Sequence, residues 1–283
     1  MRSVGILGYG KVGQFIVDKI LNDPKTKESL DLAFVWNRDQ TKLATLDSKF
    51  QLLGSDLATA YKKYRASNKA ADIVVEFSHS SIVDQYGPMF LEDSDLLVST
   101  ITAFADKRIE SKLLEAAGTH SIYLPTGAAW GVQDVLKMGK SNQIKSLKVI
   151  MNFNADALRL VGPLKDQLDN YINDQSASEP LLLYKGNIRE IAAQAPNNVN
   201  TMCCLALAAR NVGLDNTLGF LYAQKSNDAH IIDIELTGEN GFYVNTRRYN
   251  PAKKGAVTGD QTYFSFLSSL IEARGKGPGI QFC

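Results

Sequence analysis

The feature that most constrains this chain is a G-x-G-x-x-G pattern that begins seven residues after the first methionine. The short apolar run Val4–Leu7 precedes it, as expected for a buried parallel strand, and apolar residues spaced close to 3.6 positions apart follow it. Such glycines permit a tight turn and a close approach of backbone to a pyrophosphate, and the helix that follows offers free N–H groups. We therefore predict dinucleotide binding here; a purely structural turn is the alternative. The predicted contacts are Gly8, Tyr9, Gly10, Lys11, Val12 and Gly13.

Strand-like and helical segments alternate through the rest of residues 1–126. Such alternation predicts a doubly wound parallel sheet, and we assign these residues to a Rossmann domain that binds the dinucleotide. The expected strands are 32–36, 73–77, 96–99 and 122–124, and the expected helices are 40–50, 57–65, 82–91 and 106–117.

The periodicity changes after residue 126. Several segments alternate between apolar and polar residues and are joined by short turns, which indicates a mostly antiparallel sheet. We expect residues 127–251 to form a second α/β domain, and a helix within about 252–283 to pack back on the first. The expected strands are 147–154, 181–188, 219–224, 231–236 and 242–248, with one apolar helix at 201–210.

The end of the second strand indicates which dinucleotide is bound. An NAD site usually has an acidic residue there, but this chain has Asn37 followed by Arg38. A guanidinium suits a 2′-phosphate, and loss of the carboxylate removes a repulsion, so NADP is favoured over NAD. NAD remains an alternative, because Asp39 could take the acidic role if the strand ends one residue later. The alternative interpretation of Arg38 is an arginine at the surface without a role in binding.

Three loops follow parallel strands and should line the nicotinamide end of the cleft, because ligands bind beyond the carboxyl ends of such strands. They contain Ser78 and His79, Thr100, and Gly127 with Ala128. Two domains with a cleft between them indicate a dehydrogenase or reductase of a small molecule.

The composition of the chain limits the classes of partner that it is expected to bind. The net charge of +1 offers no electrostatic basis for binding nucleic acid or a membrane surface, and no apolar run is long enough for a membrane span. The three cysteines show no metal-ligand spacing and no disulfide framework, which fits a reducing compartment. We expect a cytoplasmic protein without a metal site.

Six segments together resemble the L-aspartate dehydrogenase family, and its animal branch in particular. They are GYGKVG, DIVVEFSH, LLVSTITAFAD, PTGAAWG, APNNVNTM and AHIIDIELTG, and they span nearly the whole chain. The resemblance implies oxidation of L-aspartate to iminoaspartate with NAD or NADP, followed by hydrolysis to oxaloacetate and ammonia, or use in NAD biosynthesis. It also implies a catalytic histidine at His230, cofactor contacts from Ala128 and Asn200, and a sheet that joins two subunits into a homodimer.

Some residues depart from the family pattern. Thr126 precedes Gly127-Ala128 where microbial members commonly have serine, Trp130 adds a bulky side chain nearby, and 154–164 does not match the microbial pattern. These departures concern the substrate more than the cofactor.

His230 stands where a polar loop becomes an alternating strand. Its near-neutral pKa suits a general base acting on water, or a hydrogen-bond donor to charge developing at Cα. The structural alternative is a histidine bonded to neighbouring backbone. His79 is the rival for a chemical role, and His120 is expected at the surface.

The turn before the apolar helix supplies the remaining candidates. Asn200 or Thr201 is a good N-cap, and we expect Asn200 to contact the nicotinamide while Asn198 and Thr201 receive a substrate carboxylate. Two carboxylates need a cation, for which Arg159 is the first choice, ahead of Lys165 and Arg247.

Two further functions fit the same scaffold. One is an NADPH-dependent reductase of another small imine or keto acid. The other is a sensor that binds NADPH without catalysis, against which the retention of His230 and Asn200 argues.

Overall fold

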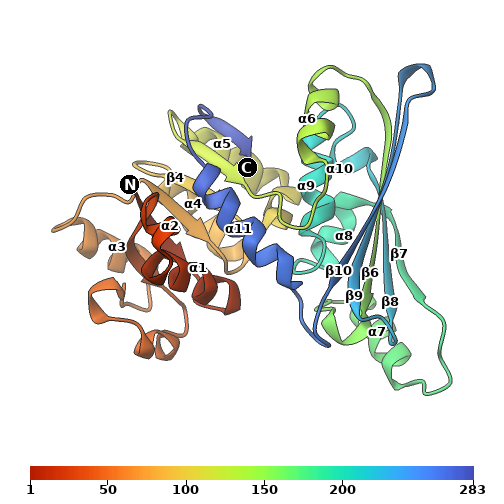
Figure 1. Cartoon of the computed structure of the whole chain (residues 1–283), viewed down its shortest axis with the longest axis horizontal. Coiled ribbons are helices and arrows are strands. Elements are labelled where there is room, and N and C mark those ends of the chain that lie inside the picture. The colour runs from red at the N-terminus through yellow and green to blue at the C-terminus, as the bar shows by residue number, and fades with distance from the viewer.

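The computed structural model describes residues Met1–Cys283 and contains two sheets, called sheet A and sheet B (Figure 1). Sheet A has the strand order β11-β5-β4-β3-β1-β2, and every pair of neighbours is parallel. This confirms the predicted Rossmann-type sheet. Its strands are β1 (Arg2–Leu7), β2 (Leu30–Trp36), β3 (Ile73–Glu76), β4 (Asp95–Val98), β5 (Ser121–Leu124) and β11 (Gly279–Phe282).

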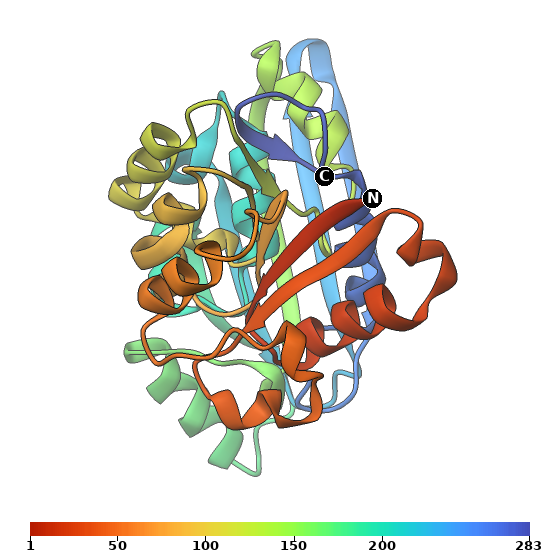
Figure 2. The same cartoon turned by 90° about the vertical axis from the view of Figure 1, so that its left-hand side faces the viewer.

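Helices cover both faces of sheet A because each central strand is apolar on both sides. On β3, Ile73 and Val75 pack toward α1 (Lys11–Asn22) and α11 (Asp260–Glu272), whereas Val74 packs into the core on the opposite face. Figure 2 shows the strands of sheet A between these two helical layers. The second layer consists of α3 (Leu57–Arg65), α4 (Ser80–Phe90) and α5 (Lys107–Ala117).

The end of the chain returns to sheet A. Phe15 of α1 makes edge-to-face contacts with Tyr263 and Phe264 of α11, at centroid distances of 5.5 and 5.2 Å. The strand β11 then pairs with β5 and forms one edge of the sheet. The sequence pattern did not predict β11, since four residues are too few for a clear period.

The prediction of one helix over residues 40–50 is wrong. The structure has two short 3₁₀ helices there, η1 (Gln40–Thr45) and η2 (Ser48–Phe50). Asp39 and Asp47 each accept a hydrogen bond from the N–H two residues later, which begins a short turn in place of a long helix. The other short helices are α2 (Pro24–Lys27) and η3 (Ile101–Ala105).

Sheet B has the order β10-β9-β6-β8-β7, and only β6 and β8 run parallel to each other. The mostly antiparallel second sheet is therefore confirmed. Its strands are β6 (Ile144–Asn154), β7 (Leu181–Asn187), β8 (Leu218–Gln224), β9 (Ala229–Gly238) and β10 (Tyr243–Pro251). The turn η5 (Glu239–Gly241) joins β9 to β10.

Helices cover only the inner face of sheet B, which is the face toward sheet A (Figure 1). The predicted apolar helix is α9 (Asn200–Ala208), and its side chains are buried almost all round, as expected for a central helix. The prediction missed the other helices of this half, whose polar faces broke the apolar pattern. They are α6 (Val132–Lys140), η4 (Ala155–Ala157), α7 (Pro163–Asn173), α8 (Ile188–Gln194) and α10 (Gly213–Asn216).

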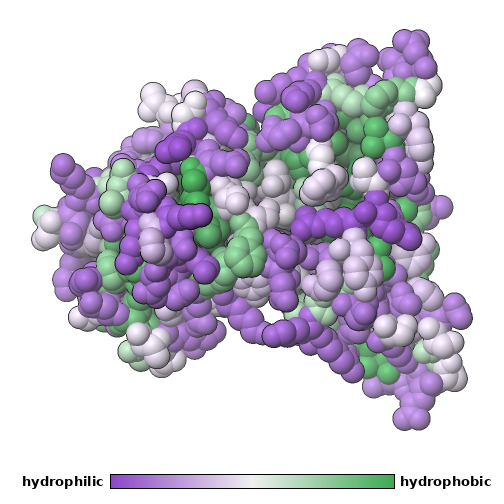
Figure 3. All heavy atoms as spheres, viewed as in Figure 1, coloured by the Kyte–Doolittle hydropathy of each residue, from purple (hydrophilic) through white to green (hydrophobic).

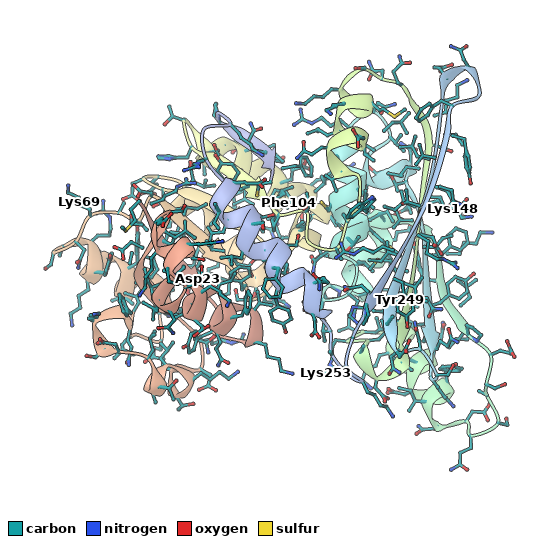
Figure 4. The ribbon with its side chains drawn as sticks, in the orientation of Figure 1. Asp23, Lys69, Phe104, Lys148, Tyr249 and Lys253 are labelled. Atoms are coloured by element: carbon teal, nitrogen blue, oxygen red, sulfur yellow. The ribbon has the colours of Figure 1, made fainter.

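One apolar core connects the two sheets. Phe104 of η3 is fully buried between them (Figure 4), and it shares a continuous core with Val98 of β4, Leu205 of α9 and Ile234 of β9. The loops of sheet A are thus fixed against α9 and sheet B. None of the helices combines the length and apolar character that crossing a membrane requires.

Candidate functional site

The glycine loop between β1 and α1 has the geometry of a dinucleotide cradle. Gly8 has φ +106°, and a Cβ there would lie 2.5 Å from the carbonyl oxygen of Phe77. A Cβ on Gly13 would lie 2.1 Å from the Gly8 carbonyl oxygen, whereas a Cβ on Gly10 would point into open space. Gly8 and Gly13 therefore allow close packing of turn and helix, and Gly10 leaves room for a phosphate at the helix N-terminus. The residues present fit the pyrophosphate of a nicotinamide dinucleotide.

The residues after β2 support this loop and leave one cation free. Asn37 accepts a hydrogen bond from the Tyr9 N–H at 2.8 Å and donates to the Asp39 carbonyl at 2.7 Å. The Asp39 carboxylate accepts from the hydroxyl and N–H of Thr41, and these bonds hold its pKa below the usual value. Arg38 is exposed and makes no hydrogen bond or ion pair. Asn37 thus organises the loop backbone, and Arg38 is the free group beside it.

The loops after β3 and β4 are tied together by a buried carboxylate that the sequence analysis did not single out. Glu76, the last residue of β3, is 1% exposed and accepts hydrogen bonds from the N–H and hydroxyl groups of both Ser78 and Thr100. Burial raises its pKa, and these four donors oppose that rise. The sequence feature that could have identified Glu76 is an acidic residue at the end of an apolar strand. Ser78 and Thr100 therefore lie at the predicted edge, held by Glu76.

His79 does not act with the other candidates. It is exposed, it caps α4 by accepting a hydrogen bond from the Ser81 N–H at 3.2 Å, and it lies outside the cavity described next. The geometry gives His79 a capping role rather than a chemical one.

A cavity, called the inter-sheet cavity, lies where the loops of sheet A meet α9 and sheet B. It brings together the predicted residues Ala128, Asn198, Asn200, Thr201 and His230. Its remaining walls are Ser99, Ile101, Pro125, Thr126, Gly127, Met151, Phe153, Asn197, Ile232, Val257, Thr258, Gly259, Thr262 and Phe266. Residues from distant parts of the chain thus converge on one space.

His230 lies on the inner face of β9 and is 5% exposed. Its ring meets Phe153 edge to face at a centroid distance of 4.6 Å, and Nε2 lies 2.9 Å from the Ala256 carbonyl oxygen. Because a carbonyl only accepts, Nε2 carries the proton in the neutral ring, and Nδ1 is the free acceptor. Nδ1 has no hydrogen-bond partner in the protein, and His230 lines the cavity. Burial lowers the pKa of His230 and keeps the ring neutral.

The turn before α9 is hydrogen-bonded to η3, the short helix that follows β4 of sheet A. The side-chain oxygen of Asn200 accepts from the Thr102 N–H at 3.0 Å, and the Thr102 hydroxyl donates to the Pro196 carbonyl at 2.8 Å. The expected N-cap is wrong, since Val199 occupies that position and no side chain caps the helix. The first three N–H groups of α9 consequently have no partner in the protein, and Asn200 and Thr201 bring this end of the helix to the cavity.

Asn198 lies in the cavity wall, but Arg159 does not. Asn198 accepts from the backbone N–H of Arg159 at 2.7 Å and donates to the Ala157 carbonyl at 3.2 Å. The Arg159 side chain is exposed, and its guanidinium donates to the carbonyls of Asp156, Leu158 and Gly255. The structure therefore does not bring the predicted carboxylate ligand Arg159 to the cavity, and its guanidinium donates to backbone carbonyls outside it.

The segment after β10 closes the cavity, which the sequence did not indicate. Ala256 holds His230, Val257 to Gly259 line the wall, and α11 adds Thr262 and Phe266. Phe266 also meets Phe77 edge to face at 5.5 Å, next to the glycine loop. The tail of the chain thus connects the cofactor cradle to the cavity.

The structure places no group of three or more His, Cys, Asp or Glu side chains where they could hold a metal ion. The thiols of Cys203, Cys204 and Cys283 are free and buried, and burial raises the pKa of each. They pack as small apolar side chains.

Comparison with known proteins matches both halves of the chain. The family model for the C-terminal part of aspartate dehydrogenase matches residues 134–269, and that for the NAD-binding domain of homoserine dehydrogenase matches 8–125. An aspartate dehydrogenase domain-containing protein of Xenopus tropicalis is 38% identical and covers 99% of this chain and 97% of its own length. Its counterpart in Danio rerio is 38% identical and covers 99% and 98%.

A more distant sequence relative and a solved structure also match the chain. The L-aspartate dehydrogenase of Methanocaldococcus jannaschii is 26% identical over 74% of each chain. The crystal structure of aspartate dehydrogenase from Thermotoga maritima superposes with a TM-score of 0.66 at 15% identity and covers 98% of both chains. The two-sheet architecture is therefore shared across low sequence identity.

Proposed function

The chain belongs to the aspartate dehydrogenase family and has an NAD-binding domain, and from this premise we propose that it oxidises L-aspartate to iminoaspartate with NADP or NAD. Iminoaspartate then hydrolyses to oxaloacetate and ammonia. One observation carries the proposal: a single cavity joins the loop Gly127–Ala128 beyond β5, the open end of α9 and a neutral, buried His230. In this proposal, residues 1–126 and the tail from about 252 form the cofactor domain, and 127–251 form the substrate domain.

The substrate binds through groups that face the cavity. The free N–H groups at the start of α9, with the Thr201 hydroxyl, receive the α-carboxylate, because a helix N-terminus favours an anion. Ala128 and the Asn200 side-chain amide line the cavity and would hold the nicotinamide ring and its carboxamide. Asn198 acts indirectly, since its two hydrogen bonds fix the backbone on which this wall rests.

A nicotinamide bound here would supply the hydride acceptor for Cα of aspartate, and the ammonium group would release one proton to water as the imine forms. The protein then assists the hydrolysis of the imine. His230 Nδ1 accepts a proton from the water that adds to the imine carbon, since it is the free acceptor of a neutral ring. The Ala256 carbonyl keeps the Nε2–H bond throughout and stabilises the imidazolium that forms. Phe153 and Phe266 limit the access of other water molecules to this position.

Three observations support a preference for NADP. The residue after β2 is an amide rather than a carboxylate, Asp39 is committed to capping η1, and Arg38 is exposed without a partner. Binding of the NAD ribose hydroxyls by the Asp39 carboxylate is thus less favourable, and Arg38 is available for the 2′-phosphate of NADP.

The test is cofactor oxidation by the purified protein with oxaloacetate and ammonium, with NADPH and NADH run side by side. We expect oxidation that requires both oxaloacetate and ammonium and is faster with NADPH. Oxidation with other keto acids but not with oxaloacetate would replace aspartate by another small amino or keto acid. Tight binding of NADPH without any turnover would favour the sensor.

We also propose a homodimer that forms through the outer face of sheet B, where no helix packs. This face combines large apolar side chains with the ion pairs Arg247–Asp233 and Lys148–Glu235, and Figure 4 shows Lys148 and Tyr249 on the sheet. Apolar patches of this kind mark interfaces. Phe220→Asp should convert the dimer to a monomer in sedimentation experiments. The free thiols fit a reducing compartment such as the cytoplasm.

A further inference from the structure

The walls of the inter-sheet cavity contain no Lys, Arg, Asp or Glu, and its one histidine is neutral. The proposed substrate has two carboxylates, and the open end of α9 accounts for one. A second carboxylate needs a cation close to the cavity. Neither remaining sequence candidate supplies it: Lys165 pairs with Asp169 on α7, and Arg247 pairs with Asp233.

The register of β9 and β10 separates Arg247 from its neighbour Arg248. Arg247 is opposite Asp233, and its guanidinium bonds the Asp233 carboxylate at 2.7 and 2.9 Å. Arg248 is opposite Ile232, which lines the cavity. Side chains directly opposite on antiparallel strands share a face, and successive residues alternate faces. Arg248 is therefore on the inner face of sheet B, the face that bears His230, and Arg247 is on the outer one.

The guanidinium of Arg248 reaches the edge of the cavity without meeting an anion. Its only hydrogen bond goes from Nη1 to the carbonyl of Gly127, a cavity residue, at 3.4 Å. It has no carboxylate partner, and its side chain is partly buried. Burial lowers its pKa with no opposing anion nearby, although an arginine remains charged at any physiological pH. Buried charges are normally paired, so the site lacks one negative group.

We propose that Arg248 binds the side-chain carboxylate of the substrate and thereby selects dicarboxylic amino and keto acids. This inference rests on the proposed function. The substrate then extends from the start of α9 to Gly127, with its α-carboxylate at the helix and its second carboxylate at the guanidinium. His230, which lies on the same face as Arg248, is beside the carbon between them.

The groove between α6 and the β9–β10 hairpin lies on the other side of Arg248. Figure 3 shows apolar residues at the surface there, and Trp130, which is 65% exposed, is part of its wall. The groove contains no histidine, whereas the guanidinium of Arg248 donates to Gly127 of the inter-sheet cavity. Arg248 therefore serves the inter-sheet cavity.

The test is calorimetric titration of succinate, an unreactive dicarboxylate, into the NADP-saturated protein. Arg248→Gln should weaken succinate binding about 10- to 100-fold, the usual effect of losing charge-assisted hydrogen bonds. Arg247→Gln is the matched control on the opposite face and should bind succinate like the wild type. Equal binding by Arg248→Gln and the wild type, or no binding by either, would overturn the proposal.

A kinetic comparison separates this inference from the proposed function. With oxaloacetate and ammonium, Arg248→Gln should raise KM for oxaloacetate about 10- to 100-fold and leave KM for NADPH unchanged. If the wild type shows no turnover but succinate binding depends on Arg248, the proposed activity fails and the carboxylate site stands. If turnover is present and only KM for NADPH changes, Arg248 serves a cofactor phosphate and the inference fails.

Discussion

The glycine loop and the inter-sheet cavity are built in opposite ways. The loop is six consecutive residues whose backbone would contact the cofactor, and its glycines matter because they lack side chains. The cavity is assembled from loops of sheet A, the start of α9, strands of sheet B and the tail, and its chemistry depends on individual side chains. A substitution in the loop should therefore act by filling space, and one in the cavity by removing a group.

The largest effect should come from the cavity. His230→Ala removes the free acceptor Nδ1, so kcat should fall by about 10² to 10⁴ while NADPH affinity stays unchanged. Steady-state kinetics and fluorescence titration of NADPH measure the two quantities. His120→Ala is the control, because His120 lies near Asp95 at the opposite end of the strands of sheet A. An unchanged kcat in His230→Ala would remove the proposed base.

Two substitutions should separate packing from binding in the loop. Gly13→Ala puts a methyl group against the Gly8 carbonyl and should cost about 1 to 3 kcal/mol of unfolding free energy. Gly10→Ala meets no protein atom and should leave stability unchanged while weakening NADPH binding. Urea denaturation and NADPH titration distinguish the two. Full NADPH affinity in Gly10→Ala would show that the phosphate lies elsewhere.

Glu76 links the two regions, because its carboxylate holds the loops after β3 and β4. Glu76→Gln places an amide N–H group against donors, and the unfolding free energy should fall by about 1 to 3 kcal/mol. Urea denaturation checks this, with Glu115→Gln on α5 as a control that has no hydrogen bond or ion pair. Equal stability of Glu76→Gln and the wild type would contradict the network.

Arg38 offers a smaller change at the edge of the loop. Arg38→Ala should weaken NADPH binding by about 10-fold and leave NADH binding unchanged, since only NADPH has a 2′-phosphate. The ratio of kcat/KM values for the two cofactors measures the preference. An unaltered ratio would show that Arg38 is a surface residue that does not contact the cofactor.

The smallest effect should be a pH dependence from His230. Because burial lowers its folded pKa below 6.5, neutral His230 persists to lower pH than a free histidine, and the acid limb of kcat/KM should lie below pH 6.5. The unfolded chain binds the proton first, so the stability from the buried neutral ring is present above pH 6.5 and is lost as pH falls toward the folded pKa. His230→Gln should remove that slope, as measured by denaturation across pH 5 to 7. An acid limb above pH 6.5 would contradict the burial argument.

The same contrast explains what the sequence could and could not predict. The glycine loop and the parallel sheet depend on local patterns, so both were predictable, and the resemblance of segments pointed to His230 and Asn200. The partner of His230 is a carbonyl 26 residues away, and the face that Arg248 occupies depends on strand register. Arg159 was selected because it is a cation near the turn, but only the fold shows that its donors point to backbone carbonyls.

The identity of the side chain alone was also insufficient to predict the roles of Glu76 and Asn198. Each is buried and fully engaged in positioning neighbouring backbone, and that role depends on contacts between separate loops. An acidic residue ending an apolar strand and an asparagine-rich turn were visible, but their partners were not.

We propose above all that the inter-sheet cavity holds the substrate against the nicotinamide. A crystal structure of the protein with NADPH and succinate tests it most directly. We predict succinate between the start of α9 and Arg248, with the nicotinamide ring beside Ala128 and His230 Nδ1 facing the ligand. Succinate bound outside this cavity, or a nicotinamide ring turned away from Ala128, would contradict the account.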